Sequence, residues 1–219
     1  MHIQLGQQHM HRIPKHHSGN TYDVLFWEVE LVDVPDCLSE LQRPDVWRAG
    51  AMSTGSSGRH QCYDCDSPLL TELLRTPARH REEFIRAVAQ FDDDTNEYYF
   101  KRSWYHGGEY YVQSAHTMTV INHDKPGFKM AIHADNSHIM LQTIINLTDN
   151  DSGTELYDIY SKEPYYTMTG EKNKGIMFFN SAGALHSIGN INKHRYTLYS
   201  AVMYGGRDLN KEAQWKKSY

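Results

Sequence analysis

A nine-residue segment near the C-terminal end, residues 195–203, constrains the fold of this chain most strongly. Side chains alternate between the two faces of an extended strand. One face of this segment would hold Arg195, Thr197, Tyr199, Ala201 and Met203. The other face would hold Tyr196, Leu198, Ser200 and Val202. Both faces are largely apolar, which is typical of a strand in the interior of a sheet. The segment therefore predicts a β-rich fold.

Several other segments have strand character. They are rich in β-branched and aromatic residues or alternate between apolar and polar positions, and they cover residues 23–34, 128–132, 139–147 and 185–188. The apolar content of 39% with 15 tyrosines and 7 phenylalanines suits such a fold. Residues 67–91 differ, because their apolar positions recur at helical spacing, and Pro77 interrupts them. We expect helices there.

Three side chains form a candidate metal site. His133 and Asp135 lie two positions apart at the end of one expected strand, and His186 lies 51 residues after Asp135 in another. Side chains at positions i and i+2 of an extended segment point to the same side and can reach one ion. Two histidines and one carboxylate are the facial triad of non-haem Fe(II) sites. His80 and Glu82 show the same spacing on an expected helix, where they point apart.

Arg195 opens the interior strand nine residues after His186. A buried guanidinium group requires an anionic partner, and its planar shape suits a carboxylate held by two hydrogen bonds. Three arrangements are open for Arg195. The guanidinium group pairs with a bound ligand, it pairs with an Asp or Glu of the protein itself, or it extends to solvent. Another histidine close to the candidate site in sequence, His123, is followed directly by Asp124. These two side chains would point to opposite faces of a strand and could not bind one ion together.

The ordered set His133-x-Asp135, His186 and Arg195-x-Thr197 resembles the Fe(II)/2-oxoglutarate-dependent oxygenase superfamily. Residues 117–133 resemble the strand and turn that precede the HxD motif in prolyl-hydroxylase-like members. Residues 153–157 resemble their GGxT stretch with one of its two glycines. The resemblance covers roughly residues 110 to 205, about half of the chain.

This resemblance implies a mainly β fold, the double-stranded β-helix (jelly-roll, cupin-like), with N-terminal helices that brace the outer face of the larger sheet. It also implies that His133, Asp135 and His186 bind Fe(II), that Arg195 binds the distal carboxylate of 2-oxoglutarate, and that Thr197 assists. Such an enzyme is a dioxygenase that uses O2, releases succinate and CO2, and hydroxylates a C–H bond. The substrate would be a protein or peptide side chain such as proline, or a small molecule.

The length of 219 residues predicts a single domain, residues 1–219. We expect a strand and helix extension over about 1–109, a double-stranded β-helix core over about 110–206 and a short C-terminal tail, 207–219.

Charge and composition exclude some classes of partner. The net charge of −5 does not favour general nucleic-acid binding, and no apolar run is long enough to span a membrane. The N-terminus lacks the apolar core of a signal peptide, and three cysteines argue against a disulfide framework. We therefore expect a soluble, cytoplasmic protein. His60, Cys62 and Cys65 could begin a zinc site, although loop cysteines are the simpler interpretation.

Several alternatives remain open at this point. The site would look similar in a non-oxidative cupin-type metal-binding protein or isomerase, and Arg195 is the residue that discriminates against it. A binding protein without activity is a third hypothesis. Substrate selection is expected from residues 104–111, 136–138 and 157–166, where three tyrosines line a groove or pack in the core: Tyr160, Tyr165 and Tyr166. The histidine-rich N-terminus could bind metal or lead into a strand.

Overall fold

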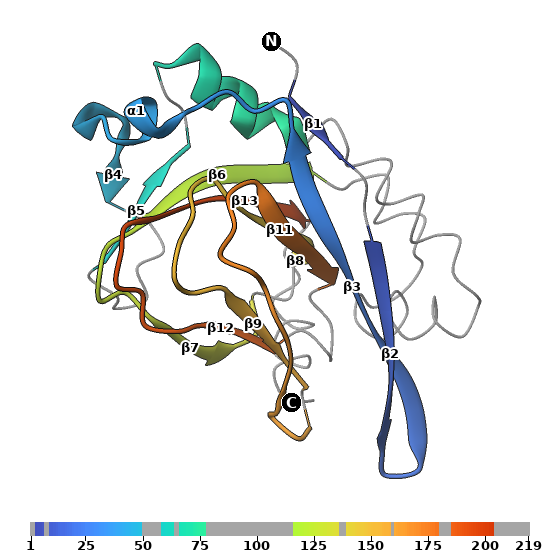
Figure 1. The fold of residues 1–219 in the computed structure, drawn as a ribbon. Coiled ribbons are helices and arrows are strands. Elements are labelled where there is room, and N and C mark those ends of the chain that lie inside the picture. The colour runs from blue at the N-terminus through green and yellow to red at the C-terminus, as the bar shows by residue number, and fades with distance from the viewer. Residues whose placement is uncertain are drawn as a thin grey trace.

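The computed structural model describes residues 3–6, 9–49, 58–63, 66–77, 116–135, 139–158, 160–179 and 185–203. These residues form a mainly β structure (Figure 1). The strands are β1 (Gln4–Leu5), β2 (His9–His17), β3 (Asn20–Val32), β4 (Arg48–Ala49), β5 (Arg59–Cys62), β6 (His116–Asp124), β7 (Met130–His133), β8 (Ile139–Asn146), β9 (Thr154–Tyr157), β10 (Pro164–Thr167), β11 (Lys174–Phe179), β12 (Leu185–Ile188) and β13 (Arg195–Met203). The short helices are α1 (Leu38–Leu41) and a 3-10 turn, Pro44–Val46.

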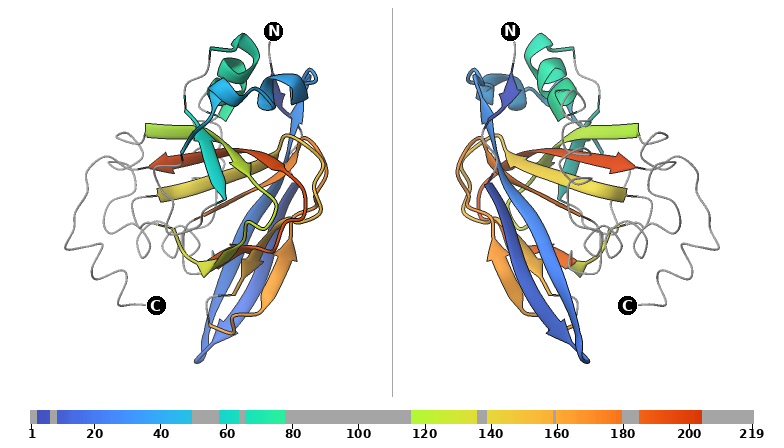
Figure 2. Two further views of the ribbon diagram at one scale, coloured as in Figure 1. Left: turned by 90° about the vertical axis from the view of Figure 1, so that its left-hand side faces the viewer. Right: turned by 90° about the vertical axis from the view of Figure 1, so that its right-hand side faces the viewer.

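Two antiparallel sheets make up the architecture. The larger has the order β1-β3-β11-β8-β13-β6-β5-β4 with β2 paired to β3, and the smaller has the order β10-β9-β12-β7. The larger sheet curls over the smaller one, as Figures 1 and 2 show, and α1 lies on its far side. The arrangement is jelly-roll-like, in agreement with the mainly β fold that the sequence predicts.

The interior strand is confirmed. β13 pairs along its whole length with β6, from Arg195↔Asp124 to Met203↔His116, and on its other side with β8. Seven of its nine residues are buried, because neighbours cover both edges and packed layers cover both faces. The strands expected at 139–147 and 185–188 are present as β8 and β12.

Alternation along the strands separates two cores. The outer core of the larger sheet includes Leu141 and Leu198, and also Leu70 and Leu73 from the helical residues 68–77. The inner core includes residues from both sheets, namely Phe26, Ile144, Leu156, Met168, Ile176 and Phe178. We call the side of the larger sheet that faces this second cluster the inner face. Polar side chains on the inner face therefore lie between the two sheets.

The sequence did not predict a partner for the strand that begins near residue 23. Residues 9–17 form that partner, β2, in register from His9↔Glu28 to His17↔Asn20. Ser18 and Gly19, which connect the two strands, have φ values of 51° and 81°. Two consecutive residues with positive φ are the signature of the tight turn that suits the twist of a hairpin. The Ser18-Gly19 dipeptide is the sequence feature that indicates this turn.

Some expectations lie partly outside the described residues. Of the helices expected over 67–91, residues 68–77 are helical, and 78–91 are not described. The bracing role of these helices and the limits at residues 109 and 206 stay predictions. The described part of the chain contains no helix with the length and apolarity to cross a bilayer.

The cysteines differ in state. Cys62 is disulfide-bonded, whereas Cys37 is a free, buried thiol. The odd number of cysteines therefore did not exclude a disulfide. Zinc binds the thiolate form of cysteine, so the disulfide at Cys62 does not support the zinc alternative. Cys65 and His80 lie outside the described residues.

Candidate metal centre

The three side chains of the expected triad lie together. His133 ends β7, and His186 lies directly opposite it on β12 as its cross-strand partner. Asp135 follows two residues after His133, where the strand has ended. One ligand-type atom from each of the three lies within 4.8 Å of the others. Among the described residues, this is the one such group of three histidine, cysteine or acidic side chains.

The orientation of the His133 ring is fixed by its backbone. Its Nδ1 lies 2.8 Å from the carbonyl oxygen of Ala131, which can only accept, so Nδ1–H donates. In the neutral ring the lone pair is then on Nε2, which lies 3.4 Å from Oδ1 of Asp135. Two acceptors that face each other at this distance require a cation or a proton between them. Metal-binding histidines commonly donate their second ring N–H to such a carbonyl.

The titration of His133 agrees with this geometry. Burial opposes protonation of the ring, yet the hydrogen bond to Asp135, the bond to the Ala131 carbonyl and the charge of Asp135 together raise the pKa of His133 above its usual value. The site therefore stabilises a positive charge at Nε2.

Asp135 is held in its charged form. Burial acts to raise its pKa, but His133, the charge of His186 and the hydroxyl of Tyr199 together lower the pKa of Asp135 below its usual value. The Tyr199 hydroxyl donates to Oδ2 of Asp135 at 3.2 Å, and Nε2 of His186 lies 4.0 Å from the same oxygen. Tyr199 thus orients the carboxylate from the middle of β13.

The second histidine has an apolar environment. His186 is 4% exposed, and the Phe178 ring packs edge-on against it at 5.3 Å. Phe178 belongs to the inner core together with Leu156, the cross-strand partner of His186. Apolar walls of this kind exclude bulk water and strengthen electrostatic interactions in the site.

Arg195 is fully buried on the inner face at the start of β13. One terminal nitrogen donates to Oδ2 of Asp124 and the other to Oγ1 of Thr154, each at 3.2 Å. Its Nε has no hydrogen-bond partner. Burial lowers the pKa of Arg195 to about 10, against the opposing effect of Asp124, so the side chain is charged at neutral pH.

A second arginine shares the same acid. Arg59 on β5 binds Asp124 through two hydrogen bonds, Nε to Oδ1 at 2.5 Å and Nη2 to Oδ2 at 2.8 Å. Its guanidinium group also lies 4.6 Å from the centre of the Phe128 ring. We call Arg59, Asp124 and Arg195 the arginine cluster. Two positive charges here share one carboxylate, so the cluster holds one positive charge in excess.

The arginine cluster lies close to the triad. The positive charge of Arg59 acts to lower the pKa values of both His133 and Tyr199, although other contributions outweigh it. Of the partners considered for Arg195, an acid of the protein itself is present as Asp124. The two arginines exceed the charge of this acid by one, which leaves room for a ligand anion as well. Thr197, the assisting residue that the sequence suggested, is buried two positions after Arg195 on the same face.

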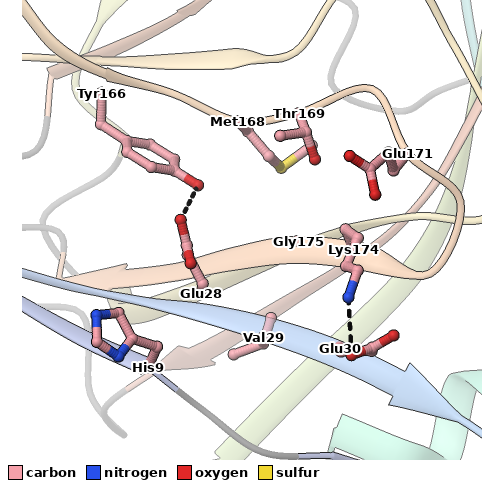
Figure 3. Close-up of a pocket in the computed structure, with 10 residues that line it drawn as sticks. All are labelled: His9, Glu28, Val29, Glu30, Tyr166, Met168, Thr169, Glu171, Lys174 and Gly175. Atoms are coloured by element: carbon pink, nitrogen blue, oxygen red, sulfur yellow. Dashed lines mark hydrogen bonds and ion pairs between the residues drawn. The ribbon is translucent and has the colours of Figure 1, made fainter.

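The three tyrosines considered for substrate contact differ in their burial. Tyr165 and Tyr166 pack on Phe26 of the inner core, whereas Tyr160 is 48% exposed. Tyr166 lines a cavity of about 360 Å³, and its hydroxyl donates to Glu28 at 2.9 Å. Figure 3 shows these side chains around the cavity. The cavity is lined by residues of β2, β3 and β11 and by four residues between Tyr166 and Glu171, and none of the triad lines it. Residues 104–111 and 136–138 lie outside the described residues.

A second group of histidines lies on the outer face of the larger sheet. Nε2 of His123 is hydrogen-bonded to Nδ1 of His194 at 2.8 Å, and the ring of His60 lies 6.0 Å away. The His123 ring stacks on Tyr196 at 4.5 Å. Burial and the neighbouring histidines lower the pKa of His123 to about 4. We call His60, His123 and His194 the outer histidine cluster.

Comparisons with known proteins give a likeness in fold. No protein-family model and no curated protein matches the sequence. A prolyl hydroxylase from Trichoplax adhaerens, solved with a hypoxia inducible factor peptide fragment, is 12% identical over 82% of this chain and 78% of its own, with a TM-score of 0.54.

A viral collagen prolyl hydroxylase from Paramecium Bursaria Chlorella virus-1, solved with 2-oxoglutarate, is 11% identical over 82% of this chain and 96% of its own, with a TM-score of 0.50. A 2OG-Fe(II) oxygenase family oxidoreductase from Burkholderia pseudomallei matches 41% of this chain, which spans 45% of that protein, at a TM-score of 0.36. The likeness to the two prolyl hydroxylases shows that the chain has the fold of the 2OG-Fe(II) oxygenases, as the motifs predicted.

Proposed function

We propose that this protein is an Fe(II)- and 2-oxoglutarate-dependent dioxygenase that hydroxylates a C–H bond. The observation that carries the metal assignment is the arrangement of His133, Asp135 and His186. A neutral His133 would direct its Nε2 lone pair at a carboxylate oxygen 3.4 Å away, and His186 lies on the same carboxylate. One divalent cation bound by all three resolves this repulsion. Two imidazoles and one carboxylate favour Fe(II) with open positions for further ligands.

The excess charge of the arginine cluster supports a dianionic co-substrate. An uncompensated positive charge is costly in a buried site, and a carboxylate beside Arg195 would remove that cost. Arg195 and Tyr199 lie on one face of β13, four residues apart, which is about 13 Å along a strand. A short diacid such as 2-oxoglutarate could extend from Arg195 towards the metal ligands near Tyr199.

When bound, Fe(II) and 2-oxoglutarate supply the oxidising chemistry: 2-oxoglutarate, O2 and R–H give succinate, CO2 and R–OH. The chain's own residues bind and orient. His133, His186 and Asp135 would hold the ion on one side, and Tyr199 keeps Asp135 in position. Arg195 would anchor the distal carboxylate, while Arg59 holds Asp124. Phe178 and Leu156 exclude water from the interior.

The proposal for the substrate is broader than the proposal for the reaction. Two of the proteins that share the fold are described as prolyl hydroxylases, which supports a protein or peptide side chain such as proline as one candidate. A small molecule is the other. The alternative function is a non-oxidative cupin-type metal-binding protein or isomerase. Such a protein would bind a metal at the same triad but would have no requirement for 2-oxoglutarate.

The test is the anaerobic addition of Fe(II) and then 2-oxoglutarate to the metal-free protein. We expect a weak visible charge-transfer band of the chelate, and slow succinate formation after exposure to O2. In Arg195→Gln, the 2-oxoglutarate concentration that gives half of the band should rise at least about thirtyfold, since loss of one partner of a buried charge pair costs ~2 kcal/mol or more.

Arg43→Gln is the matched control, because Arg43 forms exposed ion pairs with Glu40 and Asp45. It should leave the 2-oxoglutarate requirement unchanged. Metal binding without a band would favour the cupin-type alternative. An unchanged requirement in Arg195→Gln would remove the anchor role and leave the triad assignment in place.

A further inference from the structure

Gln142 on β8 is a fully buried amide without a partner. Its side chain is 0% exposed, and neither Nε2 nor Oε1 makes a hydrogen bond. Burying an amide in this state is unfavourable, and unpaired buried groups in native proteins commonly mark a place where a ligand or an ordered water binds. Gln61 provides a contrast: it is also buried, but its Nε2 donates to Asn122 at 2.9 Å and its Oε1 accepts from Tyr63 at 2.7 Å.

The register places Gln142 on the inner face beside the triad. Its cross-strand partners are Phe178 on β11 and Ala201 on β13. Partners in an antiparallel ladder lie on the same face, with Cβ atoms about 5 Å apart. Phe178 contacts the ring of His186, and Ala201 is two residues from Tyr199, which binds Asp135. Gln142 is therefore flanked by two strands whose residues contact the metal ligands.

Gln142 and Arg195 lie on opposite sides of the triad along β13. Arg195 precedes Tyr199 by four residues, about 13 Å, and the partner of Gln142 follows Tyr199 by two residues, about 7 Å. If 2-oxoglutarate fills the space between Arg195 and the metal, the primary substrate must approach from elsewhere. The register places Gln142 on the inner face on the other side of Tyr199 from Arg195, away from the position proposed for the co-substrate.

The chemistry of a carboxamide defines what it can recognise. It offers one acceptor oxygen and an NH2 donor side by side. The complementary group has an N–H and a C=O on the same edge, as in a primary carboxamide, a lactam or the imide of a pyrimidine ring. A trans peptide group directs its N–H and C=O to opposite sides, so it cannot use both atoms of Gln142.

We propose that Gln142 is a specificity-determining residue that binds the primary substrate through such a cis-amide edge, next to the C–H bond that is hydroxylated. The inference rests on the proposed function for the place of 2-oxoglutarate. The paired hydrogen bonds would fix the substrate on the side of the metal away from Arg195.

The test measures weak binding of small probes to the full-length protein by ligand-observed NMR, with Zn(II) in place of Fe(II) and without 2-oxoglutarate. 2-Pyrrolidinone has the cis-amide edge, and cyclopentanone has the same ring without the N–H. One added hydrogen bond, from the lactam N–H to Oε1 of Gln142, predicts that the lactam binds about fivefold more tightly. Gln142→Met keeps the size of the side chain and should abolish this preference. The affinities of propionamide and of uracil are then compared with that of 2-pyrrolidinone. The comparison shows whether the site prefers an open-chain amide, a planar ring or a saturated ring.

Stability provides a second, independent readout. Gln142→Met removes two unpaired polar atoms, so its melting temperature should be unchanged or higher. Gln61→Met is the matched control, which should melt at a lower temperature and keep the preference for the lactam.

The proposal is overturned if the native protein binds both rings equally, if Gln142→Met keeps the preference, or if Gln142→Met melts at a lower temperature than the native protein. A missing charge-transfer band with Fe(II) and 2-oxoglutarate would instead refute the proposed function, because the probe experiment needs neither.

Discussion

Two groups of histidines lie in this structure, one between the sheets and one on the outer face of the larger sheet. In the inner group, His133 and His186 have ring centres 4.2 Å apart and share Asp135. In the outer histidine cluster, His123 and His194 are hydrogen-bonded to each other at 2.8 Å. Both groups have closely spaced imidazoles, so the spacing of histidines alone does not distinguish them.

The difference is the carboxylate. Burial opposes protonation of His133, yet Asp135 raises the pKa of this histidine and lies opposite its Nε2, so a positive charge is favourable between them. In the outer histidine cluster only His123 is buried, whereas His60 is half-buried and His194 is exposed. Burial and the neighbouring histidines lower the pKa of His123 to about 4, although the charge of Asp124 acts in the opposite direction. One site therefore favours a cation and the other opposes one.

The largest expected effect separates the two groups by metal affinity. Asp135→Ala should weaken Co(II) or Fe(II) binding by more than about a hundredfold, since even residues that only support a ligand cost about 10–100-fold. His194→Ala should change it by less than about twofold. Anaerobic calorimetry or the visible spectrum of Co(II) measures both. Equal losses in the two variants would remove the distinction.

The second effect is the acid sensitivity of the outer cluster. The pKa of His123 in the folded protein, about 4, lies below the ordinary value of 6.5. Between these two pH values the unfolded chain therefore binds a proton at this histidine and the folded chain does not. Stability is therefore lost as the pH falls from about 6.5 to 4, by as much as about 3 kcal/mol.

Urea unfolding of the metal-free protein at pH 7 and pH 4 measures this loss. His123→Phe keeps a ring against Tyr196 and should reduce the difference between the two pH values. An unchanged pH dependence in this variant would show that other groups cause the acid sensitivity.

A smaller effect concerns the orientation of the inner carboxylate. Tyr199→Phe removes the hydrogen bond to Asp135 and should weaken metal binding about tenfold, within the range for such supporting residues. Tyr157→Phe removes a hydroxyl that donates to Glu155 on the smaller sheet and is the matched control. It should leave the metal affinity unchanged. Similar affinities in both variants would mean that Asp135 needs no support from β13.

The smallest effect tests how the arginine cluster shares its acid. Arg59→Gln would leave Asp124 to pair fully with Arg195, which should weaken 2-oxoglutarate binding about fivefold, as for a modest electrostatic contribution. Adding Asp124→Asn to that variant should restore the affinity, because Arg195 is released. Titration of the charge-transfer band gives both values. A further loss in the double variant would point to structural damage.

The proximity of His133, Asp135 and His186 could be predicted because the local rules are simple, and their role as metal ligands stays a prediction. Alternation along an extended strand places His133 and Asp135 on one side, and His186 lies in a segment that reads as a strand. The prediction that His123 and Asp124 point to opposite faces also agrees with the structure, where Asp124 binds Arg195 between the sheets and His123 stacks outside. The direction of a side chain on a strand follows from sequence.

What the sequence could not supply are partners across the sheet. Arg59 follows a run of small residues, 53–58, that gives no sign of a strand, yet it begins β5 and pairs in register with Asp124. Tyr199 was placed on the correct face without any sign of its bond to Asp135. Gln142 was one polar residue in an apolar run. Cross-strand register is set by the whole sheet, so these contacts became visible with the fold.

The position of β7 at the edge of the smaller sheet has a consequence for motion. β7 has a single neighbouring strand among those described, β12, and its Ile132 side chain is 44% exposed. An edge strand of four residues opens locally at low cost. An ion bound by His133 and His186 would link β7 to β12, so slower amide hydrogen exchange in β7 would report metal occupancy without any turnover.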